Sequence, residues 1–179
     1  MKFAHIADTH IKNLKYHYEY RIVFDQLYDE LRKQEVDYIV HCGDIAHTKT
    51  QISPEFVEMC SDFFRNLATI APTYIILGNH DGLMLNEDRL DAITPIVRAL
   101  DNPNVHLMKG TGVYPTGIDG FNWCTFCCFD SKAWQDLTPP EDGVNIALYH
   151  GPVNGSLTDQ DWEINGDSIK VDFFKGYDY

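Results

Sequence analysis

Four groups of polar residues, rich in Asp, Asn and His, each follow a short apolar segment of the chain. Carboxylate, imidazole and amide groups are ligands that suit Mn²⁺, Fe²⁺ or Zn²⁺, and no thiolate stands among them. The residue types therefore indicate a metal centre of oxygen and nitrogen donors rather than a thiolate zinc site. The groups are Asp8-Thr9-His10, Gly43-Asp44-Ile45-Ala46-His47, Gly78-Asn79-His80-Asp81 and His150-Gly151-Pro152.

The apolar segments in front of these groups have the length and composition of buried strands. In an open α/β sheet, the loops at the carboxyl ends of the strands converge on one crevice, so we expect the four groups to meet there. In Asp8-x-His10, an extended backbone places both side chains on one side. Gly43 and Gly78 allow sharp turns that bring the next side chain into the crevice.

The spacing of apolar residues predicts strands and helices in alternation, followed by strands alone, in an α/β or mixed α+β fold. Crossover helices imply parallel strands in the first half, and the later strands imply a mixed sheet or sandwich. Turn residues at 116–117 and 119–120 fit hairpins. The expected strands are 3–7, 38–42, 73–77, 105–108, 112–114, 121–128 and 144–149, and the expected helices are 18–33, 53–67 and 91–100.

Each polar group has an ordinary interpretation when it is taken alone. Asp-x-His is a common pair, Gly-Asn-His-Asp has the composition of a plain turn, and His150 alone fits a hydrogen-bonded core residue. Their joint occurrence at four predicted strand ends, in a consistent order, favours the metal site.

The chain resembles the calcineurin-like metallophosphoesterases over nearly its whole length, through the four groups described above. Within that superfamily it is most similar to DNA double-strand-break repair nucleases of the SbcD type, from phages or bacteria. His47 supports this branch, because protein phosphatases of the superfamily have an Asp at this position. The resemblance implies a β-sandwich of mixed sheets flanked by helices.

The resemblance also implies two divalent metal ions and their ligands. Mn²⁺ is the first expectation, with Fe²⁺, Zn²⁺ and Mg²⁺ as alternatives. Two such ions, about 3.5–4 Å apart, clamp a phosphate and lower the pKa of bound water. Asp44 is expected to bridge the two ions. The other ligands are Asp8 and His10 for one ion, and Asn79 and His150 for the second.

Two further histidines have roles by resemblance without being ligands. His80 faces the scissile phosphate as a general acid or transition-state stabiliser and helps the 3′ oxygen to leave. His47 lies behind the ligands or touches phosphate. The basic and aromatic loop 12–18 follows the first ligands and is either an ordinary solvated loop or a DNA-contacting edge with Lys12, Lys15 and Tyr16.

One part of the family pattern is missing. The family closes its site with a Gly-x-His pair on a later strand, whereas no His follows His150 here. We predict that the aromatic segment 173–179 is a strand, with that pair expected next. Residues 1–179 are therefore expected to form one nuclease domain that is incomplete at its C-terminus, without its last strands, and that binds Mn²⁺ weakly by itself. The alternative is a natural variant with open metal sites.

Composition excludes several classes of protein. With 179 residues, 44% hydrophobic and 23% charged, the chain suits one folded domain rather than a disordered or coiled-coil protein. No apolar run reaches the roughly 20 residues that cross a bilayer, and no signal-peptide core is evident. Five unevenly spaced cysteines suit reduced thiols in the cytoplasm, or in the host cytoplasm if a phage encodes the protein. Cys124-x-x-Cys127-Cys128 lacks further zinc ligands and lies on a predicted strand, which favours buried thiols.

The net charge of the chain limits how it can bind a substrate. Its 14 basic and 27 acidic residues give a net charge of −13. Bulk electrostatics alone would not bind nucleic acid, so bound cations must supply local positive charge. The resemblance implies hydrolysis of DNA by an exonuclease and endonuclease subunit, with an SMC-like coiled-coil ATPase as partner and a homodimer as an option. The alternatives are a phosphoesterase for a small phosphodiester or phosphoprotein, and a catalytically silent binding module.

Overall fold

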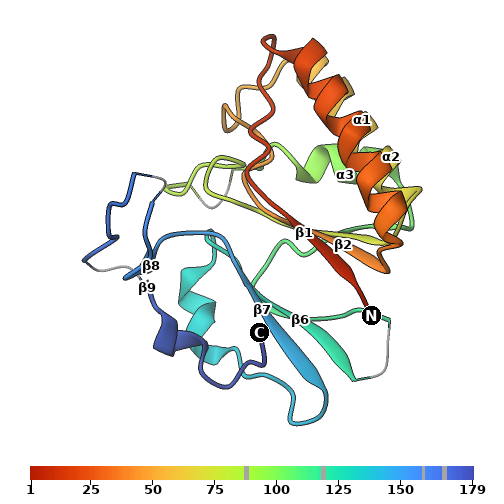
Figure 1. Cartoon of the computed structure of the whole chain (residues 1–179). Helices are drawn as coiled ribbons and strands as arrows, with labels where there is room; N and C mark the ends of the chain where they lie inside the picture. The colour runs from red at the N-terminus through yellow and green to blue at the C-terminus, as the bar shows by residue number, and fades with distance from the viewer. Residues whose placement is uncertain (87–88, 118–119, 159, 167–168) are drawn as a thin grey trace.

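The computed structural model describes residues 1–86, 89–117, 120–158, 160–166 and 169–179. Its first sheet has four parallel strands in the order β1-β2-β3-β4, which confirms the expected parallel half (Figure 1). The elements of this half are β1 Phe3–Ile6, α1 His17–Gln34, β2 Tyr38–Cys42, α2 Pro54–Ala68, β3 Thr73–Ile76, α3 Thr94–Leu100 and β4 Val105–Leu107.

The second sheet is mixed, as the later strands predict. Strand β5 (Gly112–Pro115) is antiparallel to β6 (Phe121–Phe126), and β6 is parallel to β7 (Val144–Tyr149). A 3₁₀ helix, η1 (Ser131–Asp136), lies in the connection between β6 and β7. Part of the expected hairpin turn, at 118–119, lies outside the described residues.

Both faces of the first sheet are covered, and its central strands β2 and β3 are almost completely buried. Helices α1 and α2 cover one face, where Phe24 stacks on Phe63 at a ring distance of 4.3 Å (Figure 1). The second sheet packs on the other face, where Trp123 of β6 lies 5.8 Å from the ring of Tyr74 on β3. Burial on two sides explains why the strands of the first sheet are almost continuously apolar.

Two helix starts differ in how well the sequence predicts them. Helix α2 begins as expected, because the Ser53 hydroxyl caps it by accepting the N–H of Phe56 at 3.1 Å. Helix α3 begins at Thr94 rather than at Asp91. The Asp91 carboxylate instead accepts the N–H groups of Ile93 and Thr94, at 3.0 and 2.6 Å, in a turn that delays the helix.

The end of the chain does not form the predicted strand over 173–179. Val171–Phe174 form a 3₁₀ helix (η2), and the ring of Phe173 packs on Phe126 at 5.3 Å. Packing of aromatic side chains on the core therefore prevails over strand pairing here. Only the last two residues pair with β7, where Asp178 N–H donates to the carbonyl of Asn145 at 2.8 Å. A short pair, β8 (Val153–Asn154) and β9 (Ile169–Lys170), is also absent from the sequence-based prediction.

Strand β6 ends at Phe126, two residues before its predicted end. Cys124 and Cys127 are buried free thiols, as the sequence predicts, whereas Cys128 is only partly buried and both Cys127 and Cys128 lie beyond the strand. Among the described residues, no helix is both long enough and apolar enough to cross a bilayer.

A fully buried histidine, His41 on β2, lies in the core beside the metal-ligand loops. Its Nε2 is 3.2 Å from the hydroxyl oxygen of Thr9, and its ring meets the edge of Phe63 at 6.1 Å. Burial is the main cause that lowers the pKa of His41 to about 3. The folded protein therefore keeps this imidazole neutral.

We expect His41 to make the protein acid-sensitive. In the unfolded chain His41 takes up a proton near pH 6.5, but in the folded chain only near pH 3, so stability falls as pH drops through this window. Between pH 7 and 4.5 this loss is about 2–3 kcal/mol. Urea unfolding across this range is expected to show a shallower decline in the free energy of unfolding for His41→Leu. Equal declines in the two proteins would contradict this explanation.

Candidate functional site

The predicted site residues lie at the carboxyl ends of β1, β2, β3 and β7. The parallel pairing of β1 and β2 continues into their loops, where Asp8 N–H donates to Gly43 O at 3.1 Å and His10 N–H to Asp44 O at 3.0 Å. The expectation of an extended Asp8-x-His10 backbone is wrong, because both residues have left-handed φ, at 56° and 43°. Their side chains still meet, with His10 Nε2 3.7 Å from Asp8 Oδ1.

Asp44 is the centre of the site. Its Oδ2 lies 3.5 Å from His10 Nε2 and 3.3 Å from His150 Nε2, so one oxygen faces imidazoles from two different strand ends. Its Oδ1 accepts the backbone N–H of His80 at 2.8 Å. The carboxylate is buried, whereas Asp8 is exposed at the mouth of the site.

Two glycines allow Asp44 to reach this position. Gly43 has φ +88°, and a Cβ there would lie 2.7 Å from the backbone nitrogen of Gly78. A Cβ at Gly78 would collide with the Asp44 carboxylate itself. Both positions therefore need glycine, because the β2 and β3 loops approach each other backbone to backbone.

His150 faces Asp44 with a defined nitrogen. Its Nδ1 lies 2.7 Å from the carbonyl oxygen of Cys42, which only accepts, so Nδ1 carries the proton and Nε2 points toward Asp44. Burial acts to lower the pKa of His150, but the Asp44 carboxylate outweighs it and the pKa is raised. Burial likewise acts to raise the pKa of Asp44, but hydrogen bonds from His150 and His80 outweigh it and the pKa is lowered. The two shifts together favour a protonated His150 beside an ionised Asp44, so a positive charge is favoured next to this carboxylate.

The donor set fits a divalent cation at this point. One ligand atom from each of Asp8, Asp44 and His150 lies within 4.8 Å of the others. His10 is not part of this group of three, but its Nε2 lies 3.7 Å from Asp8 Oδ1 and 3.5 Å from Asp44 Oδ2. A cation between these atoms would satisfy lone pairs that otherwise depend on a proton, and metal binding would then compete with protonation of His150. Asn79 lines the same cavity as Asp8, Asp44 and His150.

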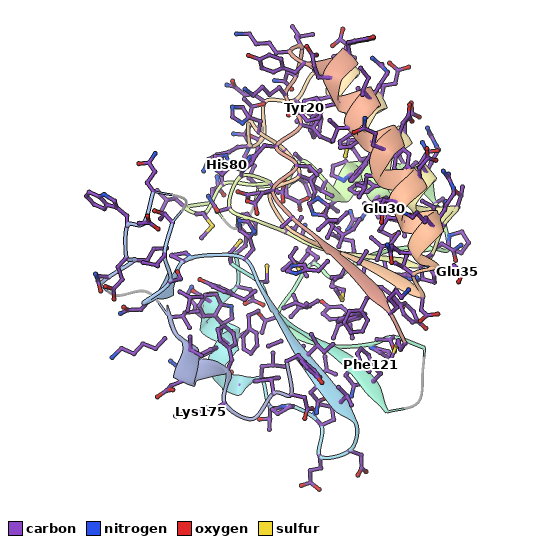
Figure 2. The ribbon with its side chains drawn as sticks, in the orientation of Figure 1. Tyr20, Glu30, Glu35, His80, Phe121 and Lys175 are labelled. Atoms are coloured by element: carbon purple, nitrogen blue, oxygen red, sulfur yellow. The ribbon has the colours of Figure 1, made fainter. Side chains whose placement is uncertain are left out.

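The remaining two predicted histidines stand beside the ligand set. The ring of His80 lies 4.9 Å from that of His10, and His47 lies 5.7 Å from His10. His80 Nδ1 is 3.2 Å from the carbonyl oxygen of His47, so Nδ1 is the donor and Nε2 is left available. Figure 2 shows His80 at the same end of the molecule as Tyr20, near the start of α1.

The three predicted substrate contacts lie together in the loop that follows Asp8 and His10. Lys12 places its Nζ 4.9 Å from the centre of the Tyr16 ring, while Lys15 is exposed in the same loop. Tyr16 lines a cavity that also contains Asp8. The loop therefore adjoins the ligands, but its lysines are not among them.

Two residues that hydrogen-bond to the backbone of the site loops were not among the predicted site residues. Asp81 is buried and accepts the N–H groups of Ala46 and Gly78, at 2.8 and 2.9 Å, which ties together the β2 and β3 loops. Its place in Gly-Asn-His-Asp was the available signal, although turn composition explained it equally well. Lys49 donates to the backbone carbonyl of Asn79 at 3.4 Å, a contact for which the sequence gives no periodic signal.

Comparison with known proteins identifies the family. The model of the calcineurin-like phosphoesterases matches residues 1–179. The chain belongs to the calcineurin-like phosphoesterase family. This family binds divalent metals, and the Asp and His cluster around Asp44 is the candidate site in this member.

Individual proteins that are similar to this chain share between 17% and 36% sequence identity with it. The chain is 36% identical to uncharacterized protein R555 of Acanthamoeba polyphaga mimivirus, over 98% of the chain and 14% of that protein. It is 28% identical to the DNA double-strand break repair protein Mre11 of Methanopyrus kandleri, over 100% of the chain and 43% of that protein. A nuclease, MPE of Pseudomonas putida, matches with 17% identity and a TM-score of 0.42, over 81% of this chain and 58% of its own. The chain thus spans less than half the length of these two curated relatives.

We expect Asp44→Asn to weaken metal binding strongly, because a neutral amide is a poorer ligand for a divalent cation than a carboxylate. The affinity for Mn²⁺, measured by calorimetry, is expected to fall by at least about tenfold. Asp29→Asn is the matched control, since Asp29 is an exposed residue of α1 paired with Arg32. Unchanged Mn²⁺ binding by a folded Asp44→Asn protein would exclude the central role of this carboxylate.

Proposed function

We propose that this chain is the metal-dependent nuclease domain of a DNA phosphodiesterase. The observation that supports this most is the position of Asp44, whose Oδ2 has imidazole nitrogens at 3.5 and 3.3 Å on two sides. A carboxylate between two nitrogen donors suits the bridge of a two-metal site. Membership of the calcineurin-like phosphoesterase family makes the chain a hydrolase of phosphate esters.

Five residues are proposed to hold two divalent ions, with Mn²⁺ as the first candidate. When bound, such ions clamp the phosphate and lower the pKa of a water molecule for attack. The set combines carboxylate, imidazole and amide donors, which suits Mn²⁺ or Fe²⁺ better than a thiolate metal. The proposed ligands are Asp8, His10, Asp44, Asn79 and His150.

His80 is proposed to assist the leaving group. Its Nδ1–H donates to the His47 carbonyl, which leaves Nε2 to hold the proton that the leaving 3′ oxygen takes. Its backbone N–H donates to Asp44 Oδ1, so the same residue is held at a fixed position relative to the bridging carboxylate. His47 is proposed to contact phosphate, because its side chain is exposed beside that of His10.

DNA is the substrate that we favour over a small phosphodiester or a phosphoprotein. Lys12, Lys15 and Tyr16 lie next to the ligands and offer cations for the backbone and a ring for a base. Two curated relatives are named DNA double-strand break repair protein Mre11. We further propose an SMC-like coiled-coil ATPase as partner, a role in DNA repair or recombination, and the cytoplasm, or the host cytoplasm, as location.

The site is proposed to need a second Gly-x-His pair besides Gly78-Asn79-His80, because residues 151–179 contain no His. Five protein ligands leave much of two coordination spheres unfilled, so the 179 residues alone are expected to bind Mn²⁺ weakly. Activity is therefore best measured in the natural protein that contains these residues.

We expect the natural protein that contains these residues to release nucleotides from end-labelled DNA in the presence of Mn²⁺, and to lose this activity in a chelator.

His80→Gln is expected to keep the metal content and to lower turnover by about 10²- to 10⁴-fold, because only the proton donor is removed. His106→Gln is the control, since His106 lies exposed on β4. Loss of metal in proportion to activity would make His80 a ligand. Efficient cleavage of bis-p-nitrophenyl phosphate without cleavage of DNA would contradict the proposed substrate.

A further inference from the structure

An apolar cavity of about 370 Å³ opens next to the proposed metal site, at the start of α1. It shares Asp8 with the cavity that contains Asp44, Asn79 and His150, so the two spaces meet at a metal-ligand candidate. Three of its side chains from α1 are apolar or aromatic: Tyr20, Val23 and Phe24. The roles proposed above involve only one side chain of this cavity besides Asp8, namely Tyr16 as a DNA contact.

The inner wall of the cavity is rigid. Phe24 is 5% exposed and stacks on Phe63, while the ring of Tyr20 lies 5.6 Å from that of Phe24. The Tyr20 hydroxyl donates to the backbone carbonyl of His10 at 2.6 Å. This wall is therefore attached directly to a proposed metal ligand, and the distance between cavity and metal site is fixed.

The outer wall is apolar yet open to solvent. Tyr16 is 55% exposed and Val23 is 56% exposed. Tyr16 has a left-handed φ of 64°, directly before the first turn of α1, and Lys12 lies over its ring. Apolar surface of this kind beside a polar site is typical of a place that a ligand covers.

The charges around the cavity restrict its occupant. Glu19 and Asp8 lie at its edge, which disfavours an anion inside, whereas the cation of Lys12 stands outside over Tyr16. These charges favour an occupant without negative charge, and the rings of Tyr16, Tyr20 and Phe24 favour a flat one. The volume lies near the lower end of the roughly 300–1,000 Å³ of small-molecule sites, which suits one base rather than paired strands.

We propose that this cavity holds the nucleobase of the nucleotide whose phosphate is cleaved. The inference rests on the proposed DNA phosphodiesterase function and adds to it a substrate class, namely an unpaired nucleotide. A base in this cavity cannot remain stacked within a duplex, so the preferred substrate is a single strand or an unpaired end. Stacking on Tyr16 accepts any of the four bases, because each has a π face.

Cleavage of two single strands in the natural protein tests the proposal. One strand has a normal base at a defined position, and the other has a tetrahydrofuran abasic residue there. Wild-type protein is expected to cleave beside the base about 5- to 150-fold more efficiently, the range that stacking of one base provides. Val23→Glu places a carboxylate in the cavity and is expected to bring this ratio close to one.

The matched control is Val113→Glu, because Val113 is an exposed residue of β5 in the other sheet. It adds the same charge and is expected to keep the wild-type ratio. Binding is measured separately with a strand containing 2-aminopurine, in a chelator so that no cleavage follows. Its fluorescence is expected to be quenched by wild-type protein and by Val113→Glu, but not by Tyr16→Leu or Val23→Glu.

The outcomes separate this proposal from the function on which it rests. Efficient DNA cleavage with no preference for the base-bearing strand, or with the same preference in Val23→Glu, would overturn the base pocket and leave the nuclease function intact. Cleavage of a small phosphodiester but of neither strand would overturn the nuclease function itself. Quenching that survives in both cavity variants would also overturn the pocket.

Discussion

The Asp44 carboxylate is the group around which the rest of the site is arranged. Its two oxygens have different tasks, since Oδ1 accepts the N–H of His80 and Oδ2 faces His10 and His150. This arrangement is possible only because Gly43 and Gly78 bring two loop backbones closer than any side chain would permit. A single close approach of two glycines thus sets the distance between three strand ends.

A second acid, Asp81, maintains that approach. It accepts one N–H from each loop, Ala46 and Gly78, and is fully buried below Asp44. Burial is the main cause that raises the pKa of Asp81 to about 7, with the charge of Asp44 adding to it and the two hydrogen bonds opposing it. The site therefore contains two neighbouring acids with different surroundings. One is open to histidines and to the cavity, and the other is enclosed by backbone.

The sequence predicted the parts of the fold that depend on short-range patterns. The strands of the parallel sheet and the cap at Ser53 follow from apolar spacing and local chemistry, and both are present. The left-handed backbone at Asp8 and His10 was not predictable, because it arises from pairing with the β2 loop. Likewise, segment 173–179 has the composition of a strand, but its rings find a better place on Phe126 than a strand would give them.

A net charge of −13 and a DNA substrate are compatible if binding does not depend on the phosphates alone. Contacts between a base and an apolar wall are insensitive to the charge of the protein, unlike contacts to the backbone, which weaken with repulsion and with salt. At physiological salt, charges more than about 8 Å away are largely screened, so distant acids would have little effect on a DNA phosphate placed beside the lysines of loop 12–18. If the proposed function holds, an apolar cavity beside bound divalent cations, with Lys12 over the Tyr16 ring at its outer wall, would give an acidic protein a local route to a polyanion.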